Sequence, residues 1–164
     1  MCVAAVLAAL PTTVSTSGAQ TIKLTDACDP ATFNLPQPQG IGPGTCVGDG
    51  EVTLSAFRAE FGATGQVEDW AFDPDRDQFD SGEAVRGENE GGEAHTFTEV
   101  AAFGGGLVPP LNAFAGATRP ECFTTAVVPP GGQSKAVALS PGTHKFQCCI
   151  HPWMRTTLTV RQHN

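Results

Sequence analysis

Glycine and proline interrupt the chain so often beyond residue 66 that only short elements of secondary structure fit between them. The 164 residues include 19 glycines and 13 prolines. Breaks fall at "DSG", "EGGE", "FGGGLVPP", "PPGGQ" and "SPG", and the segments between them, such as "AHTFTEV", "HKFQCC" and "TTLTVR", are of strand length. Short strands with regular turn signals are typical of sandwiches and barrels. We therefore expect an all-β fold.

One short helix is predicted ahead of this region. In "EVTLSAFRAEFGATG", the apolar residues Leu54, Phe57 and Phe61 recur at helical spacing, and Gly62 is a favourable stop. The apolar stripe of such a helix normally packs against a core. The preceding residues 20–49 hold a stretch rich in proline and glycine, "DPATFNLPQPQGIGPGTCVGDG", which shows no period, so we expect this stretch to be a loop.

The N-terminus has the features of an export signal. Residues Val3 to Leu10 form an apolar run that is too short to span a bilayer, and Ser17-Gly18-Ala19 is a suitable cleavage site of small residues. The expected organisation is a signal peptide at 1–19, an N-terminal extension with a loop and the short helix at 20–66, and the β domain at 67–164. Export implies a periplasmic or extracellular location.

The charge of the chain excludes several classes of partner. A formal net charge of −8 argues against binding to nucleic acid or to anionic lipid, because both need clustered Lys and Arg. No segment is long and apolar enough to predict a membrane span. We expect a monomer, which its charge could steer toward a basic partner.

Cysteines are the next constraint, because cleavage near Ala19 leaves an odd number of them. The remaining cysteines are Cys28, Cys46, Cys122, Cys148 and Cys149. One metal thiolate and two disulfides would account for five. Four paired cysteines allow three connectivities, and sequence alone does not choose among them; Cys28 with Cys46 is the local pairing.

The densest group of metal-binding side chains is the motif C-x2-H-x2-M near the C-terminus. In "KFQCCIHPWM", strand alternation places Cys148 on the same face as Phe146, while Cys149 points the other way. Pro152 then helps to turn the chain before "TTLTV" leaves as a new strand. The turn would bring the Cys148 thiolate, the His151 imidazole and the Met154 thioether around one point.

A fourth ligand must come from another histidine. His163 is near the chain end, and His144 lies too far back along the strand that leads to Cys148. His95 follows a glycine-rich turn at the start of a strand and is the best candidate. Two histidines, a cysteine and a weak axial methionine are the ligand set of a blue-copper electron-transfer site.

With these ligands, the stretch from Trp70 to Val160 resembles the cupredoxin (plastocyanin-like) family. The tail "GTHKFQCCIHPWMRTTLTV" is similar to the strand, ligand loop and closing strand of that family, and "NEGGEAHTFTEV" resembles the segment with its first histidine. "WAFDPDRDQFDSGEAV" resembles its opening strands. The resemblance implies a Greek-key β-sandwich and one type 1 copper ion bound by His95, Cys148, His151 and Met154. It also implies one-electron transfer with redox partner proteins and no catalytic reaction.

Two further expectations concern the neighbours of these ligands. Cys149 is expected to form a disulfide, with Cys122 as its partner, and Cys28 then pairs with Cys46. The edge of His151, beside Pro152 and Trp153, is expected to reach an apolar surface patch where partners dock. The alternative is that Trp153 simply packs over the loop.

Other interpretations remain open at this point. A structural zinc site at this motif would need a fourth Cys or His ligand in place of Met154. The acidic run "DPDRDQFDSGE" resembles a calcium loop at its first acids but lacks the required Gly and final Glu, which favours a solvated hairpin. The alternative functions are a copper-binding or copper-delivery protein without a redox partner, and a metal-free binding module stapled by disulfides.

Overall fold

The computed structural model describes residues 18–162, so the predicted export signal lies outside the described residues except for its last two positions, and so does His163. The elements in chain order are β1 (Gln20–Thr25), α1 (Pro30–Phe33), α2 (Leu54–Thr64), β2 (Ala71–Asp73), β3 (Arg76–Asp80), β4 (Ala84–Asn89), β5 (His95–Thr96), β6 (Thr98–Glu99), the 3-10 helices η1 (Pro109–Asn112) and η2 (Pro120–Thr124), β7 (Val127–Val128), β8 (Val137–Ala138), β9 (Gly142–Gln147) and β10 (Arg155–Arg161). In the described residues, no helix is long and apolar enough to cross a membrane.

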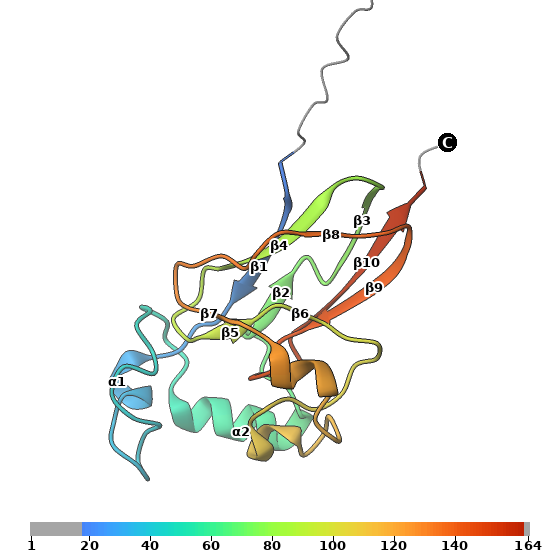
Figure 1. Ribbon diagram of the computed structural model, residues 1–164. Helices are drawn as coiled ribbons and strands as arrows, with labels where there is room; N and C mark the ends of the chain where they lie inside the picture. Colours follow the sequence, from blue (N-terminus) through green and yellow to red (C-terminus); the bar gives the residue numbers. More distant parts are fainter. Residues whose placement is uncertain (1–17, 163–164) are drawn as a thin grey trace, which may run out of the picture.

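The strands form a β-sandwich, which confirms the predicted fold class. One four-stranded sheet has the order β2-β1-β4-β8, and the other has the order β3-β10-β9-β6. The pair β5-β7 forms a small third sheet beside them, and the helices gather at the same end of the molecule (Figure 1). Aromatic rings connect the two large sheets, since Phe97 stacks on Phe146 at 4.3 Å between ring centroids and lies 5.7 Å from Phe72.

The N-terminal extension begins with a strand that sequence analysis did not identify. β1 lies inside its sheet, parallel to β4 and antiparallel to β2. The alternation in "TIKLT" explains the strand, because Ile22 and Leu24 point into the core with 1% and 0% exposure. The Pro/Gly-rich loop begins only after this strand, and the short helix α1 interrupts it.

The predicted helix is present as α2, but it continues past Gly62. Its first turn is capped by Thr53, whose side chain accepts a hydrogen bond from the amide of Ala56. The helix ends at Gly65, which has a φ of 79° and donates its N–H to the carbonyl of Phe61. A left-handed cap favours glycine, so Gly65 rather than Gly62 is the stop.

Two disulfides connect distant parts of the chain. Cys28 bonds Cys46 within the extension, and Cys122 in η2 bonds Cys149 just beyond β9. Both are the pairings expected from the sequence. Cys148 is the free cysteine among the described residues, and it is buried.

Candidate metal centre

Three of the predicted ligands meet in the structure. His95 opens β5, Cys148 directly follows β9, and His151 lies in the turn beyond it. Their ligand atoms all lie within 4.8 Å of one another. The Nδ1 atoms of the two imidazoles are 3.3 Å apart, and the Cys148 Sγ is 3.8 Å from the Nδ1 of His95. The three residues are 0%, 0% and 4% exposed in chain order, so the group is shielded from water.

The turn that carries Cys148 and His151 is closed by backbone hydrogen bonds. Gln147 in β9 pairs with Arg155 in β10, so the connection runs from 148 to 154. The amide of Cys148 donates to the carbonyl of Met154 at 3.0 Å, and the amide of Met154 donates to the carbonyl of His151 at 3.0 Å. The turn therefore fixes the sulfur and the imidazole relative to two paired strands.

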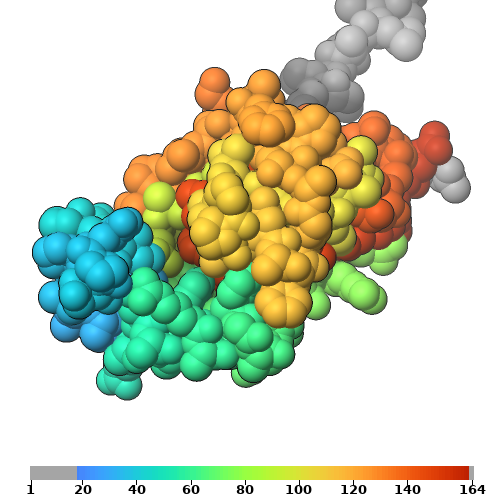
Figure 2. Space-filling model, turned by 90° about the horizontal axis from the view of Figure 1, so that it is seen from below, coloured from blue at the N-terminus to red at the C-terminus, as the bar shows by residue number. Residues whose placement is uncertain are grey.

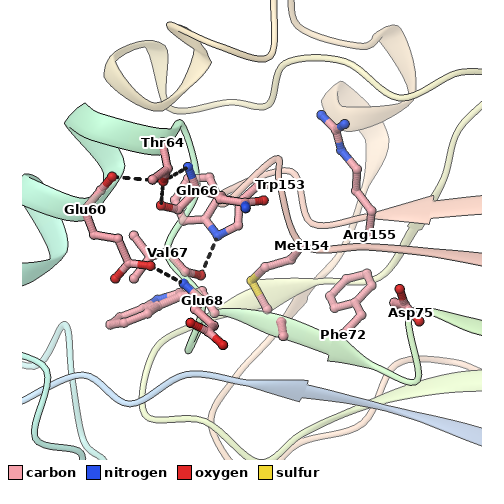
Figure 3. A pocket seen from close by; sticks show the side chains of 12 residues that line it. Glu60, Thr64, Gln66, Val67, Glu68, Phe72, Asp75, Trp153, Met154 and Arg155 are labelled. Carbon is pink, nitrogen blue, oxygen red and sulfur yellow. Dashed lines mark hydrogen bonds between the residues drawn. The ribbon is translucent and has the colours of Figure 1, made fainter.

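Met154, the fourth predicted ligand, is buried at the end of this turn with 1% exposure. Its side chain lines a pocket of about 470 Å³ beside α2 and lies between Trp153 and Phe72 (Figure 3). Trp153 is held there by a hydrogen bond from its indole N–H to the carbonyl of Val67 at 3.2 Å. The thioether is thus in a packed apolar environment next to the turn.

The sulfur of Cys148 is surrounded by hydrogen-bond donors. The backbone amides of Thr96, Ile150 and His151 each lie 3.4 Å from it. Burial alone would raise the pKa of the Cys148 thiol, but hydrogen bonds from His151 and His95 hold this pKa well below its usual value. These hydrogen bonds favour the thiolate, which is the form that binds metals.

A buried carboxylate holds the far side of His95. The Oδ2 atom of Asp26 lies 2.9 Å from the Nε2 of His95, and both side chains are 0% exposed. Asp26 also accepts hydrogen bonds from the amides of Glu93 and Cys28 at 2.9 and 3.2 Å. Burial alone would lower the pKa of His95, but the hydrogen bonds to Asp26 and Cys148 raise this pKa to about 9. In the neutral imidazole, the form that binds a metal, the bond to Asp26 favours the proton on Nε2 and leaves Nδ1 facing the sulfur of Cys148.

A second carboxylate lies behind His151. The Oε2 atom of Glu93 is 3.5 Å from the Nε2 of His151, and it accepts a 2.7 Å hydrogen bond from the indole N–H of Trp70. The Glu93 side chain is 6% exposed, and its burial raises the pKa of the carboxyl group. Both imidazoles are thus backed by an acidic residue. Sequence analysis identified neither Asp26 nor Glu93 as part of the site.

Glycine in "NEGGEAH" makes room for this arrangement. A Cβ atom on Gly91 would lie 2.0 Å from the Oδ2 of Asp26, and one on Gly92 would lie 2.7 Å from the Sγ of Cys28. The Gly-rich turn was recognised in the sequence as a break before a strand. In the structure it is where the extension approaches the segment that carries His95.

Most of His151 is covered by α2 and its neighbours, which leave 4% of the residue exposed, and the docking patch at its edge stays a prediction. His151 is surrounded by the rings of Phe57, Trp70 and Trp153, with centroids 6.4, 6.5 and 5.5 Å away. Pro152 is buried and Trp153 is half-buried. Trp153 packs over the loop against Phe57 and Phe61 at 5.9 and 5.1 Å, which is the alternative considered above.

The other candidates lie apart from this group. His144 bonds Glu99 through Nδ1 at 2.6 Å and the carbonyl of Ser140 through Nε2 at 2.8 Å. Among residues 18–162, the acidic run that resembles a calcium loop contributes to no group of potential metal ligands, whereas His95, Cys148 and His151 form one.

The buried thiolate between two imidazoles, on a β-sandwich, is the arrangement that the sequence motif led us to expect. The chain resembles the cupredoxins. No protein-family model matches the sequence, and no curated protein matches it. Among solved structures, it is similar to a purple cupredoxin from Nitrosopumilus maritimus, with a TM-score of 0.46, 13% identity and coverage of 86% of this chain and 98% of that chain.

Amicyanin variants are also similar to this cupredoxin-like chain. The Cu(I) form of a methionine-to-alanine variant gives a TM-score of 0.40 and 15% identity, covering 56% of this chain and 73% of that chain. A reduced Cu(I) form of a proline-to-glycine variant at pH 4 gives 0.41 and 16%, covering 58% and 77%. At these identities and TM-scores, the case for a metal in this chain depends on its own side chains.

Proposed function

We propose that the chain is an exported type 1 (blue) copper protein that binds one copper ion and carries single electrons between partner proteins, without a catalytic reaction of its own. The observation that carries this proposal is the convergence of one buried thiolate and two imidazole Nδ1 atoms within 4.8 Å. Each imidazole has a carboxylate at its Nε2 atom, so each Nδ1 is left for a metal.

The donor set fits copper better than zinc. His95, Cys148 and His151 would supply two nitrogens and one sulfur, and Met154 would be the weak axial ligand. A structural zinc site would need a fourth Cys or His, and the group contains none. When bound, copper in such a set exchanges one electron between Cu(II) and Cu(I) with little change of geometry.

The protein's own residues keep this set rigid and dry. The three amides around the Cys148 sulfur hold the thiolate in place, and the disulfide of the adjacent Cys149 anchors the turn to η2. The aromatic rings of α2 and the turn pack against His151 and leave it 4% exposed. Preorganised ligands suit electron transfer, because little must move when the charge changes.

Burial favours a carrier over a copper-delivery protein. All three residues are at most 4% exposed, and a protein that hands metal to an acceptor needs at least one of them well exposed. The two disulfides favour export, because such bonds persist in oxidising compartments. We propose a periplasmic or extracellular monomer whose redox partners are proteins.

The first experiment is a visible absorption spectrum of the purified protein with Cu(II), before and after ascorbate. We expect an intense thiolate-to-copper band that bleaches on reduction and returns on oxidation. Cys148→Ser should abolish this band, and His144→Gln, which changes a histidine outside the group, should retain it. A protein that binds zinc tightly but gives no band with Cu(II) would contradict the proposal.

Electrochemistry then separates the two copper functions. A carrier should give a reversible voltammetric wave and retain its metal against a moderate chelator. A protein that loses copper quickly to the chelator and gives no reversible wave would instead be a delivery protein.

A further inference from the structure

Pockets adjoin the ligand turn at two places. The first, of about 470 Å³, lies beside α2 and has Met154 in its lining (Figure 3). The second, of about 390 Å³, has His151 in its lining, together with residues of the extension, of α2 and of the gold segment near residue 110, which meet on the face shown in Figure 2. Since the residues of the candidate metal centre are at most 4% exposed, these openings are the candidate paths between the centre and solvent.

Acidic side chains determine the charge of the first pocket. The carboxylates in its lining belong to Glu60, Glu68 and Asp75. Arg155 also lines it, but its guanidinium lies over the ring of Phe103, 5.0 Å from the centroid, and its Nε donates to the carbonyl of Pro152 at 2.6 Å. Figure 3 shows this side chain pointing away from Met154. The first pocket therefore attracts cations, and a charged cleft of this kind raises the rate at which ions of opposite sign arrive.

A soft metal ligand lies in the same pocket. Exposed carboxylates alone are common on protein surfaces and would not indicate a route to a metal site. Here the Met154 side chain is part of the lining although the residue is only 1% exposed, so the pocket leads to a buried thioether. Thioethers bind copper, and the carbonyl of Met154 accepts the amide of Cys148 at 3.0 Å. The carboxylates and the thioether together connect solvent with the ligand turn.

The second pocket suits an incoming ion less well. Its lining is mainly apolar and includes the rings of Phe57 and Phe61. The charged residues in the lining, Arg58 and Glu93, have opposite signs, so the pocket has no excess of negative charge. A cation that leaves water for an apolar passage loses hydration without compensation. The first pocket is therefore the better path.

We infer that the first pocket is the entry port of the candidate metal centre: a copper ion is attracted by its carboxylates, meets the Met154 thioether and then reaches Cys148 and the two histidines. The inference rests on the proposed function, because it gives the copper site of that proposal its route of loading. The carboxylates act on the approaching ion, whereas the ligands determine how tightly the ion is held. The entry port should therefore control the rates of uptake and release more than the dissociation constant.

The test measures uptake and release of Cu(II) by the metal-free protein with both disulfides intact. The rings of Trp70 and Trp153 lie 6.5 and 5.5 Å from that of His151, so quenching of tryptophan fluorescence after rapid mixing reports uptake. Recovery of the fluorescence in excess EDTA reports release. Gln66 is exposed and lines the entry port, so Gln66→Tyr should slow uptake and release by one common factor and leave their ratio, the dissociation constant, unchanged.

Charge gives a quantitative test. The double variant Glu68→Gln/Asp75→Asn removes two exposed carboxylates of the entry port, and it should slow uptake about tenfold at an ionic strength of about 0.01 M. The effect should largely disappear at about 1 M, where the screening length falls to about 3 Å. Asp49→Asn/Glu51→Gln is the matched control, because it removes the same charge from exposed positions outside the entry port; it should slow uptake less than about twofold.

Several results would overturn the inference. Equal slowing by the two double variants would mean that uptake responds to net charge and not to the entry port. Ile41 lines the second pocket and is 40% exposed, so slowing by Ile41→Tyr but not by Gln66→Tyr would assign entry to that pocket. Tight Cu(II) binding at rates that none of these changes affects would exclude the entry port and leave the proposed function standing. Failure to bind Cu(II) at all would overturn both, which distinguishes the two failures.

Discussion

Replacing Asp26 with asparagine should strongly destabilise the metal-free protein, although the side chain keeps its size. The carboxylate accepts hydrogen bonds from His95, from the amide of Glu93 and from the amide of Cys28. Asparagine has one acceptor oxygen and one NH2 group. If the oxygen faces His95 and Glu93, the NH2 group faces the amide of Cys28, so one bond is lost and the other two lose their charge assistance.

The size of the effect follows from these three contacts. A bond to a charged group contributes about 1.5–3 kcal/mol, whereas a neutral one contributes about 1 kcal/mol. Losing one bond and weakening two therefore costs about 3 kcal/mol. This agrees with the roughly 3–5 kcal/mol for removal of one partner of a buried ion pair. The side chains of Asp26 and His95 are both 0% exposed, so water does not compensate.

The assay is equilibrium unfolding in urea with both disulfides intact. At a slope of about 2 kcal/mol per M, a loss of 3 kcal/mol lowers the unfolding midpoint by about 1.5 M. Asp49→Asn is the matched control, because Asp49 is exposed and has no hydrogen-bond partner in the described part of the chain; it should change stability by less than about 0.5 kcal/mol. A similarly small effect of Asp26→Asn would refute the conclusion that the buried Asp26–His95 pair stabilises the metal-free protein.

Three further changes test other parts of the structure. Gly91→Ala should lower the free energy of unfolding by about 1–3 kcal/mol, and with it the thermal midpoint, because its Cβ would overlap the carboxylate of Asp26; an unchanged midpoint in a thermal melt would mean that the two segments separate easily. Trp70→Phe should cost about 1–3 kcal/mol in urea, since it leaves Glu93 without its 2.7 Å donor, and an unchanged midpoint would contradict this role. Burial lowers the pKa of His144, but the bonds to Glu99 and Ser140 raise it above 6.5 overall. The stability from this ion pair is therefore fully present below pH 6.5 and is lost as the pH rises through the raised pKa. His144→Asn should destabilise the protein by about 0.5 kcal/mol near pH 5.5 and by less near pH 8.5, and a pH-independent difference would disprove the assignment.

The ligand motif was predictable because its spacing is local. Strand alternation and one turn suffice to place Cys148 and His151 together, and His95 was chosen because it begins a strand after a glycine-rich turn. The β-sandwich followed from turn signals that recur along the sequence. These features depend on near neighbours in the chain, where sequence reasoning is strongest.

The carboxylates behind the histidines were not predictable in the same way. Asp26 is 69 residues from His95, and nothing in the sequence around it marks it as different from an acidic residue in an exposed turn after a strand. The alternation of Ile22 and Leu24 could have revealed the strand, but the proline and glycine that follow obscured it. Similarly, sequence analysis assigned the apolar stripe of α2 to core packing. It did not identify the ligand turn as the segment against which this stripe packs.

The cover over His151 has a consequence for the kinetics of metal exchange. Phe57 and Phe61 of α2 contact Trp153, and together these rings cover one side of the ligand turn. Local opening of this cover would speed the escape of an ion from the site, so its residence time would depend on the frequency of that opening as well as on the affinity. The extension would thus set how long the protein retains its metal, while the turn sets how tightly it binds.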